Sequence, residues 1–213
     1  MPVLGGAVTL SRFRAEQARK VPSDVRRWLA RALASNAFEP LDPGRAEEDR
    51  AAGFVELEDR DATEFGRALE GEYALFAWRV DAIQVRAAAV KAEVERWVAA
   101  ETAEKGRPPG KREKAERREI VRQTLRQKTE PTTKVHDVSW NLKSGEVAIW
   151  AASRKVVEEV AAAIESAFEA KLQPVTPGAV AARRKVPEKA LLPTAELVGV
   201  GVEASVEVNR GEA

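Results

Sequence analysis

The sequence predicts an α+β protein built from two small β-sheets, helices packed against them and a protruding helical hairpin rich in basic residues. Three observations lead to this fold class. Segments of strand and helix periodicity follow one another in the order β-α-β-β-α-α-β-β-α-β. Paired prolines divide a long helical region into two helices. Two alternating segments joined by a Gly-containing turn indicate a β-hairpin. The fold is expected to occupy residues 1–177, followed by a flexible tail at residues 178–213.

The N-terminal part is predicted to hold one helix among short strands. Val8 and Leu10 alternate in a strand at residues 6–13. A helix then begins after Asp24 and has apolar side chains at helical spacing. These side chains are Val25, Trp28, Leu29, Ala32 and Leu33. Two further strands are expected at residues 54–57 and 73–80. The second is almost continuously apolar, which favours a central position in a sheet.

The middle of the chain predicts the helical hairpin, at about residues 86–130. Residues 106–110 include two prolines and must end its first helix. A second helix is expected at residues 110–129. Its few apolar residues lie towards its C-terminal half, and they are Ile120, Val121 and Leu125. The first half of this helix is therefore expected to extend beyond the core.

The C-terminal part predicts a β-hairpin, a helix and an edge strand. Residues 133–142 and 146–151 alternate on either side of a turn. Ser153 can cap a helix that carries a clean apolar stripe. A strand is expected at residues 172–175. Pro174 within it indicates a position at the edge of the sheet, because proline cannot donate a ladder hydrogen bond. Periodicity is lost after Gly178.

Charge is sorted by helix face in the second helix of the hairpin. Residues 105–134 contain eleven basic and four acidic residues. Because successive helical residues turn by ~100°, Glu113 and Glu116 fall opposite a stripe of basic side chains. A one-sided basic stripe suits a polyanion, and DNA phosphates are the usual one. The candidate DNA-binding residues are Lys111, Lys114, Arg118, Arg122 and Arg126, with Arg107 and Lys128 beside them.

Two other interpretations of the basic helix remain open. A charged face can be merely solvated, although such a face usually mixes signs at i,i+4 spacing. A protein–protein adaptor would instead use the basic helix to hold an acidic partner. On the preceding helix, Arg86, Lys91 and Arg96 are interpreted as solvated, with phosphate contacts as the alternative. DNA binding is the preferred interpretation.

An acidic segment precedes the basic hairpin. Residues 45–72 contain ten acidic and four basic residues. This segment is the only feature that could hold Mg²⁺ for a nuclease, but its carboxylates are expected mostly in a loop. The chain has no cysteine and a single histidine, His136, which excludes thiol chemistry and imidazole pairs. We predict no catalysis, no cofactor and no metal, and interpret the segment as a solvating or DNA-repelling face.

Other sequence features favour a cytoplasmic protein with a packed core. The sequence has no apolar run of ~18 residues and no charged-then-apolar N-terminus typical of a signal peptide. Four tryptophans are interpreted as core residues, namely Trp28, Trp78, Trp97 and Trp140. Trp150 alternates away from the inward positions of its strand, so a binding or dimer contact is the alternative there.

Short motifs in a fixed order carry a resemblance to a known family. In the N-terminal half they are Ser11-Arg12-Phe13, Ala37-Phe38-Glu39-Pro40 and Gly53-Phe54-Val55. Next come the strand at residues 71–80, the helix around Val90 and the Gly106-Arg107 break with its basic helix. The last are the hairpin from Trp140 to Gly145 and Ala152-Ser153-Arg154-Lys155. Because these motifs occur in this order and spacing, the chain resembles, up to about Pro177, the RdgC family of recombination-associated DNA-binding proteins.

The resemblance implies a cytoplasmic, nucleoid-associated homodimer that closes into a ring around double-stranded DNA. Such proteins bind without sequence preference and restrain strand exchange by competing with a RecA-type recombinase. Typical members have a further C-terminal part, which this sequence is expected to lack. They also carry Leu-Pro-Arg-Ala-Phe at the end of the basic helix, where residues 125–129 have no aromatic side chain. We therefore predict a non-enzymatic, sequence-nonspecific DNA-binding protein that modulates homologous recombination, with the adaptor as the alternative.

Overall fold

The structure is a computed structural model that describes residues 9–17, 21–44 and 48–187. Its elements are β1 (Ser11–Gln17), α1 (Val25–Ala34), β2 (Arg50–Val55), β3 (Leu69–Glu70), β4 (Tyr73–Ala82), α2 (Ala87–Lys105), α3 (Lys111–Gln127), β5 (Thr132–Asn141), β6 (Glu146–Ile149), α4 (Arg154–Phe168), β7 (Ala170–Pro174) and α5 (Pro177–Arg183). The chain divides into two compact units, at residues 1–173 and 174–213.

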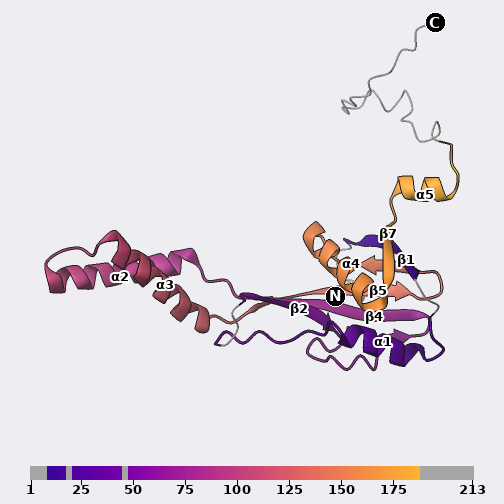
Figure 1. The fold of residues 1–213 in the computed structure, drawn as a ribbon, viewed down its shortest axis with the longest axis horizontal. Helices are drawn as coiled ribbons and strands as arrows, with labels where there is room; N and C mark the ends of the chain where they lie inside the picture. Colours follow the sequence, from indigo (N-terminus) through magenta and orange to yellow (C-terminus); the bar gives the residue numbers. More distant parts are fainter. Residues whose placement is uncertain (1–8, 18–20, 45–47, 188–213) are drawn as a thin grey trace, which may run out of the picture. The chain divides into compact units, whose positions relative to one another are not determined.

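Seven strands form one sheet in the order β2-β4-β5-β6-β1-β7, with β3 paired to β4 (Figure 1). The protein has an α+β fold, but the prediction of two small sheets is wrong, because all seven strands belong to one sheet. β4 and β5 are antiparallel over ten residues each, from Tyr73 opposite Asn141 to Ala82 opposite Thr132. β5 also pairs with β6, from Val138 opposite Ile149 to Trp140 opposite Val147, so this part of β5 is hydrogen-bonded on both edges. β5 thus joins β4 and β6 in one sheet, where the sequence analysis predicted two.

The main core lies between this sheet and the helices α1 and α4. Leu29 of α1 and Ile164 of α4 are fully buried in one cluster with strand residues such as Phe76 and Val138. At its centre, the ring centroid of Trp140 lies 6.1 Å from that of Trp28 and 5.0 Å from that of Phe168. These rings meet edge to face, the arrangement that aromatic quadrupoles favour. The sheet and these two helices therefore form one packed body.

The N-terminal strand is displaced from its predicted position. We expected it at residues 6–13, whereas β1 occupies Ser11–Gln17 and pairs with β6 through Phe13 opposite Val147. Residues 1–8 lie outside the described part of the chain. The helix after Asp24 is confirmed, because the Asp24 carboxylate accepts a hydrogen bond from the Arg27 amide at 3.1 Å and caps α1.

The helices α2 and α3 form a hairpin inserted between β4 and β5. Figure 1 shows them side by side at the end of these two strands. Gly106 ends α2 in the left-handed region, at φ 68°, which glycine adopts without a Cβ clash. The hairpin has a small core of its own, in which Val90, Val94 and Val121 are buried. Among the described helices, none is long and apolar enough to cross a membrane.

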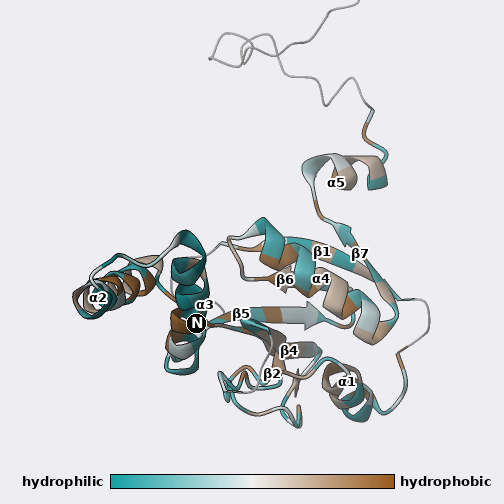
Figure 2. Cartoon of the chain, turned by 60° about the vertical axis from the view of Figure 1, so that its left-hand side comes forward, coloured by the Kyte–Doolittle hydropathy of each residue, from teal (hydrophilic) through white to brown (hydrophobic). Residues whose placement is uncertain are grey.

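The hairpin core is narrow because most of α3 is polar. Figure 2 colours most of this helix as hydrophilic. The guanidinium carbon of Arg117 lies 5.7 Å from the centre of the Trp97 ring, so a cation–π contact extends the apolar contact between the two helices. Trp97 is half-buried and belongs to the hairpin rather than to the main core.

In the second unit, the described chain forms the short helix α5. Thr176 caps it by accepting a hydrogen bond from the Ala179 amide at 3.1 Å, and Pro177 occupies the first turn. Loss of apolar periodicity after Gly178 did not predict this helix, because a small Ala-rich helix needs no apolar stripe. The rest of the expected tail, residues 188–213, lies outside the described residues.

Candidate nucleic-acid interface

The basic face of α3 is exposed where the helix begins. Gly110 precedes the helix, and its amide donates a hydrogen bond to the Glu113 carboxylate at 2.6 Å. A carboxylate in the first turn also interacts favourably with the helix dipole. Arg112 pairs with Glu116 at 2.9 Å on the same side of the helix as Glu113. These acids therefore stabilise the helix on the side away from the basic stripe.

Three cations of the stripe are not used in ion pairs among the described residues: Lys111, Lys114 and Arg118. Lys111 and Arg118 are exposed, and Lys114 is half-buried. By contrast, Lys105 at the end of α2 pairs with Glu101 at 2.6 Å, and this hydrogen bond raises the pKa of Lys105. The beginning of α3 thus presents positive charge that the described residues do not neutralise.

Arg107 and Lys128 lie at the two ends of α3. Arg107 is in the break between the helices, and Lys128 is the C-cap residue, and both are exposed. The structure therefore keeps six of the seven predicted residues at least partly accessible. The exception is Arg126.

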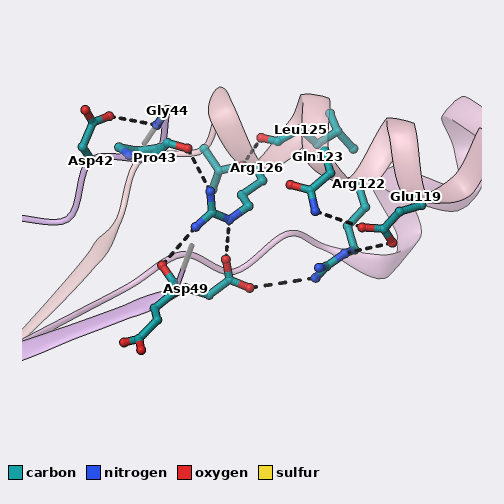
Figure 3. A network of polar contacts seen from close by, with 11 residues as sticks. Asp42, Pro43, Gly44, Asp49, Glu119, Arg122, Gln123, Leu125 and Arg126 are labelled. Atoms are coloured by element: carbon teal, nitrogen blue, oxygen red, sulfur yellow. Dashed lines mark hydrogen bonds and ion pairs between the residues drawn. The ribbon is translucent and has the colours of Figure 1, made fainter. Parts of the chain in front are cut away.

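Arg126 is buried, with only 7% of its surface exposed. Its Nε donates to the Asp49 carboxylate, its Nη1 donates to the Pro43 carbonyl at 2.9 Å, and its Nη2 donates to the Glu48 carbonyl at 3.0 Å (Figure 3). The guanidinium is therefore occupied within the chain and cannot also reach a DNA phosphate without breaking this network. Arg126 holds α3 to the segment that leads into β2.

Arg122 lies between the network of Arg126 and the open part of the stripe. Its Nη1 is 3.9 Å from the second Asp49 oxygen, and its Nε is 3.5 Å from Glu119 (Figure 3). Its side chain is 48% exposed, so both ion pairs are screened by water and weak. Arg122 can therefore exchange these partners for a phosphate, which Arg126 cannot.

Sequence reasoning missed the role of Arg126 because helix periodicity describes only one element. The periodicity correctly puts Arg126 on the same face as Arg122, but its partner Asp49 is 77 positions away in the chain. A weak signal was available. The apolar residues Val121 and Leu125 lie in the C-terminal half of this helix, so this half was expected to lie nearer the core than the first half.

Most described carboxylates of the acidic segment lie in loops, as predicted, and among them only Glu70 belongs to a strand, β3. Residues 50–55 form β2, and several carboxylates have structural partners. Asp61 and Asp81 both bind the Arg79 guanidinium, and the hydrogen bond to Asp81 raises the pKa of Arg79. Within the described residues, no group of three or more His, Asp or Glu side chains is arranged to hold a metal ion.

His136 is half-buried on β5, opposite Trp78. Burial lowers the pKa of this imidazole, because the charged form loses hydration. A hydrogen bond to the backbone of Trp150 acts in the opposite direction, and Lys134 lowers the pKa further. His136 is therefore neutral at physiological pH and adds no charge to a DNA-binding surface. Trp150, expected as an exposed aromatic in one alternative, is half-buried beside it.

The comparison with known families agrees with this architecture. A family model described as "Putative exonuclease, RdgC" matches residues 9–185, which include the whole sheet and the hairpin. The chain belongs to the RdgC family, so the predicted resemblance is confirmed. No curated protein matches the sequence.

Replacing Arg126 with Gln should loosen α3 without unfolding the main core. The change removes three charged hydrogen bonds, and because Asp49 is half-exposed we expect a loss of about 1–3 kcal/mol of local stability. Hydrogen exchange of amides in α3 should then accelerate by about tenfold or more.

The matched control is Arg118→Gln, which removes an exposed guanidinium from the same helix. We expect its effect to stay within about 0.5 kcal/mol, because Arg118 has no ion pair among the described residues. Equal exchange rates in the two variants would show that Arg126 does not anchor the helix.

Proposed function

We propose that the chain is a non-enzymatic protein that binds double-stranded DNA through the phosphate backbone and modulates homologous recombination. Membership of the RdgC family supports a recombination-related role. The observation that carries the proposal is the row of unneutralised cations at the start of α3, held at a defined place by the buried Arg126. By competing for DNA, such a protein would limit access of a RecA-type recombinase.

The residues of this row favour phosphate binding without base readout. α3 has 17 residues and is therefore ~25 Å long, a span over which duplex DNA presents many phosphates. Lys and Arg contacts to phosphates position a protein on DNA but carry no sequence information. We assign this role to Lys111, Lys114, Arg118 and Arg122, with Arg107 and Lys128 at the ends, and leave Arg126 out.

A homodimer in the cytoplasm, associated with the nucleoid, is part of the same proposal. One basic helix offers few phosphate contacts, and each contact contributes separately to affinity. Two copies would double the number of contacts on one DNA molecule. This part of the proposal rests on family analogy.

The alternative function is a protein–protein adaptor. One observation favours it: α3 already binds a carboxylate of its own chain, because Asp49 contacts both Arg122 and Arg126. An acidic partner could extend this contact along the helix. DNA is the better ligand, because the free cations are spaced along the helix rather than gathered around one acidic side chain.

Changing Lys111 and Lys114 together to Glu should weaken binding to duplex DNA. We expect the affinity to fall by about tenfold or more, equally for unrelated DNA sequences, and the slope of log K against log salt to flatten by ~1.8 if two phosphate contacts are lost. Fluorescence anisotropy with labelled duplexes at several salt concentrations measures both quantities.

The control carries the same change of charge on another surface. Lys155 of α4 and Lys171 of β7 are exposed, and their replacement by Glu should leave the salt slope unchanged. If both double variants lose affinity to the same extent, only net charge matters and the basic helix is not the interface. If DNA binds neither the wild type nor the variants while an acidic protein does, the adaptor is the correct function.

The non-enzymatic part of the proposal has a separate test. Asp49 is engaged with Arg126, and Asp61 and Asp81 are engaged with Arg79, so we expect linear DNA to stay intact with Mg²⁺ or Mn²⁺. Gel analysis of end-labelled DNA checks this. Metal-dependent loss of DNA that disappears in Asp61→Asn would contradict the proposal and would establish the exonuclease activity that the family's description names.

A further inference from the structure

A groove lies where the β4–α2 connection meets α3, and it has a volume of about 590 Å³. Its apolar wall is formed by Ile83, Val85 and Val90, of which Ile83 and Val90 are buried. Three cations from two helices line the remaining walls, and they are Lys91, Arg118 and Arg122. The acid among the lining residues is Asp49.

We propose that this groove is a phosphodiester-binding subsite, which takes one phosphate of the DNA backbone and packs the adjoining deoxyribose against its apolar wall. The inference rests on the proposed DNA-binding function and adds α2 to the interface. Lys91 had been interpreted as a solvated residue. The structure instead places it in one concave site with two arginines of the basic helix.

Charge in the groove is available to a ligand. Arg118 makes no ion pair among the described residues, and Lys91 has only the exposed Glu95, at 3.8 Å on its own helix. An exposed pair of this kind contributes little and is easily exchanged. The first turn of α2 also lines the groove, and its N-cap residue Arg86 makes no side-chain capping bond, so the helix dipole adds to the positive potential.

The carboxylate of Asp49, which lines the groove, already contacts two arginines of α3. One of its oxygens binds Arg126, and the other lies 3.9 Å from Nη1 of Arg122 (Figure 3). A phosphate that enters the groove can replace the second contact while Arg126 keeps the first. Arg122 therefore changes partner without release of the anchor, and α3 stays in place when DNA binds.

The test compares two double variants of the hairpin. Lys91→Gln with Arg118→Gln removes two charges from the groove, whereas Arg96→Gln with Arg112→Gln removes two charges from exposed positions outside it. Each control residue pairs with an acid of its own helix, as Lys91 does. Stability should be similar in the two variants, since all four side chains are largely exposed.

We expect the groove variant to bind duplex DNA about tenfold more weakly and to flatten the salt slope by ~1.8, while the control stays within about twofold of the wild type. If the wild type binds DNA and the two variants bind equally, the groove proposal is wrong and the DNA-binding function stands. If the wild type does not bind DNA, the proposed function itself fails.

A second measurement distinguishes a DNA phosphate from a free phosphate. The Nε–H signal of Arg118 in an NMR spectrum should shift when duplex DNA is added and not when inorganic phosphate is added at the same phosphate concentration. The Nε–H signal of Arg112 serves as the internal reference. Saturable shifts of Arg118 with inorganic phosphate alone would assign the groove to a small anion and overturn the DNA assignment.

Discussion

The contact between Arg126 and Asp49 attaches the helical hairpin to the segment that leads into the sheet. The hairpin of α2 and α3 buries only three valines of its own, too few to fix its direction relative to the sheet. Arg126 supplies the missing connection, because one guanidinium ties the end of α3 to a carboxylate and to two backbone carbonyls of the segment before β2. The C-terminal end of α3 is thereby held close to the end of β4 and the start of β2.

This arrangement explains how a nearly neutral chain can present a cationic surface. The net charge is only +1, so a basic surface requires that the acids be used elsewhere. Asp49 is held by Arg126, Asp61 and Asp81 are held by Arg79, and Glu113 binds the amide that precedes α3. Among the described residues, Lys111, Lys114 and Arg118 of α3 are left without such partners. The same acids therefore stabilise the fold without neutralising these three cations.

Local patterns predicted the helices well and the sheet poorly. The apolar spacing from Val25 to Leu33, the Pro108-Pro109 break and the alternation from Val138 to Trp140 depend on neighbouring residues, and each corresponds to an element of the structure. The pairing of β4 with β5 joins residues separated by the whole hairpin, and no local pattern encodes such a partner. The burial of Arg126 was missed for the same reason, since it depends on a distant segment. The family resemblance rests on the order of motifs over most of the chain rather than on any one local pattern, and the family assignment is confirmed.

The central claim, that the hairpin is the surface that meets DNA, is tested most directly by lysine footprinting. The protein is treated with an amine-acylating reagent with and without duplex DNA, and modification is measured at each lysine by mass spectrometry. We expect DNA to protect Lys91, Lys111 and Lys114. The exposed lysines of the β5–β6 turn, α4 and β7, which are Lys143, Lys155 and Lys171, should stay as reactive as before. Protection confined to the second group, or none at all under conditions where DNA is bound, would contradict it.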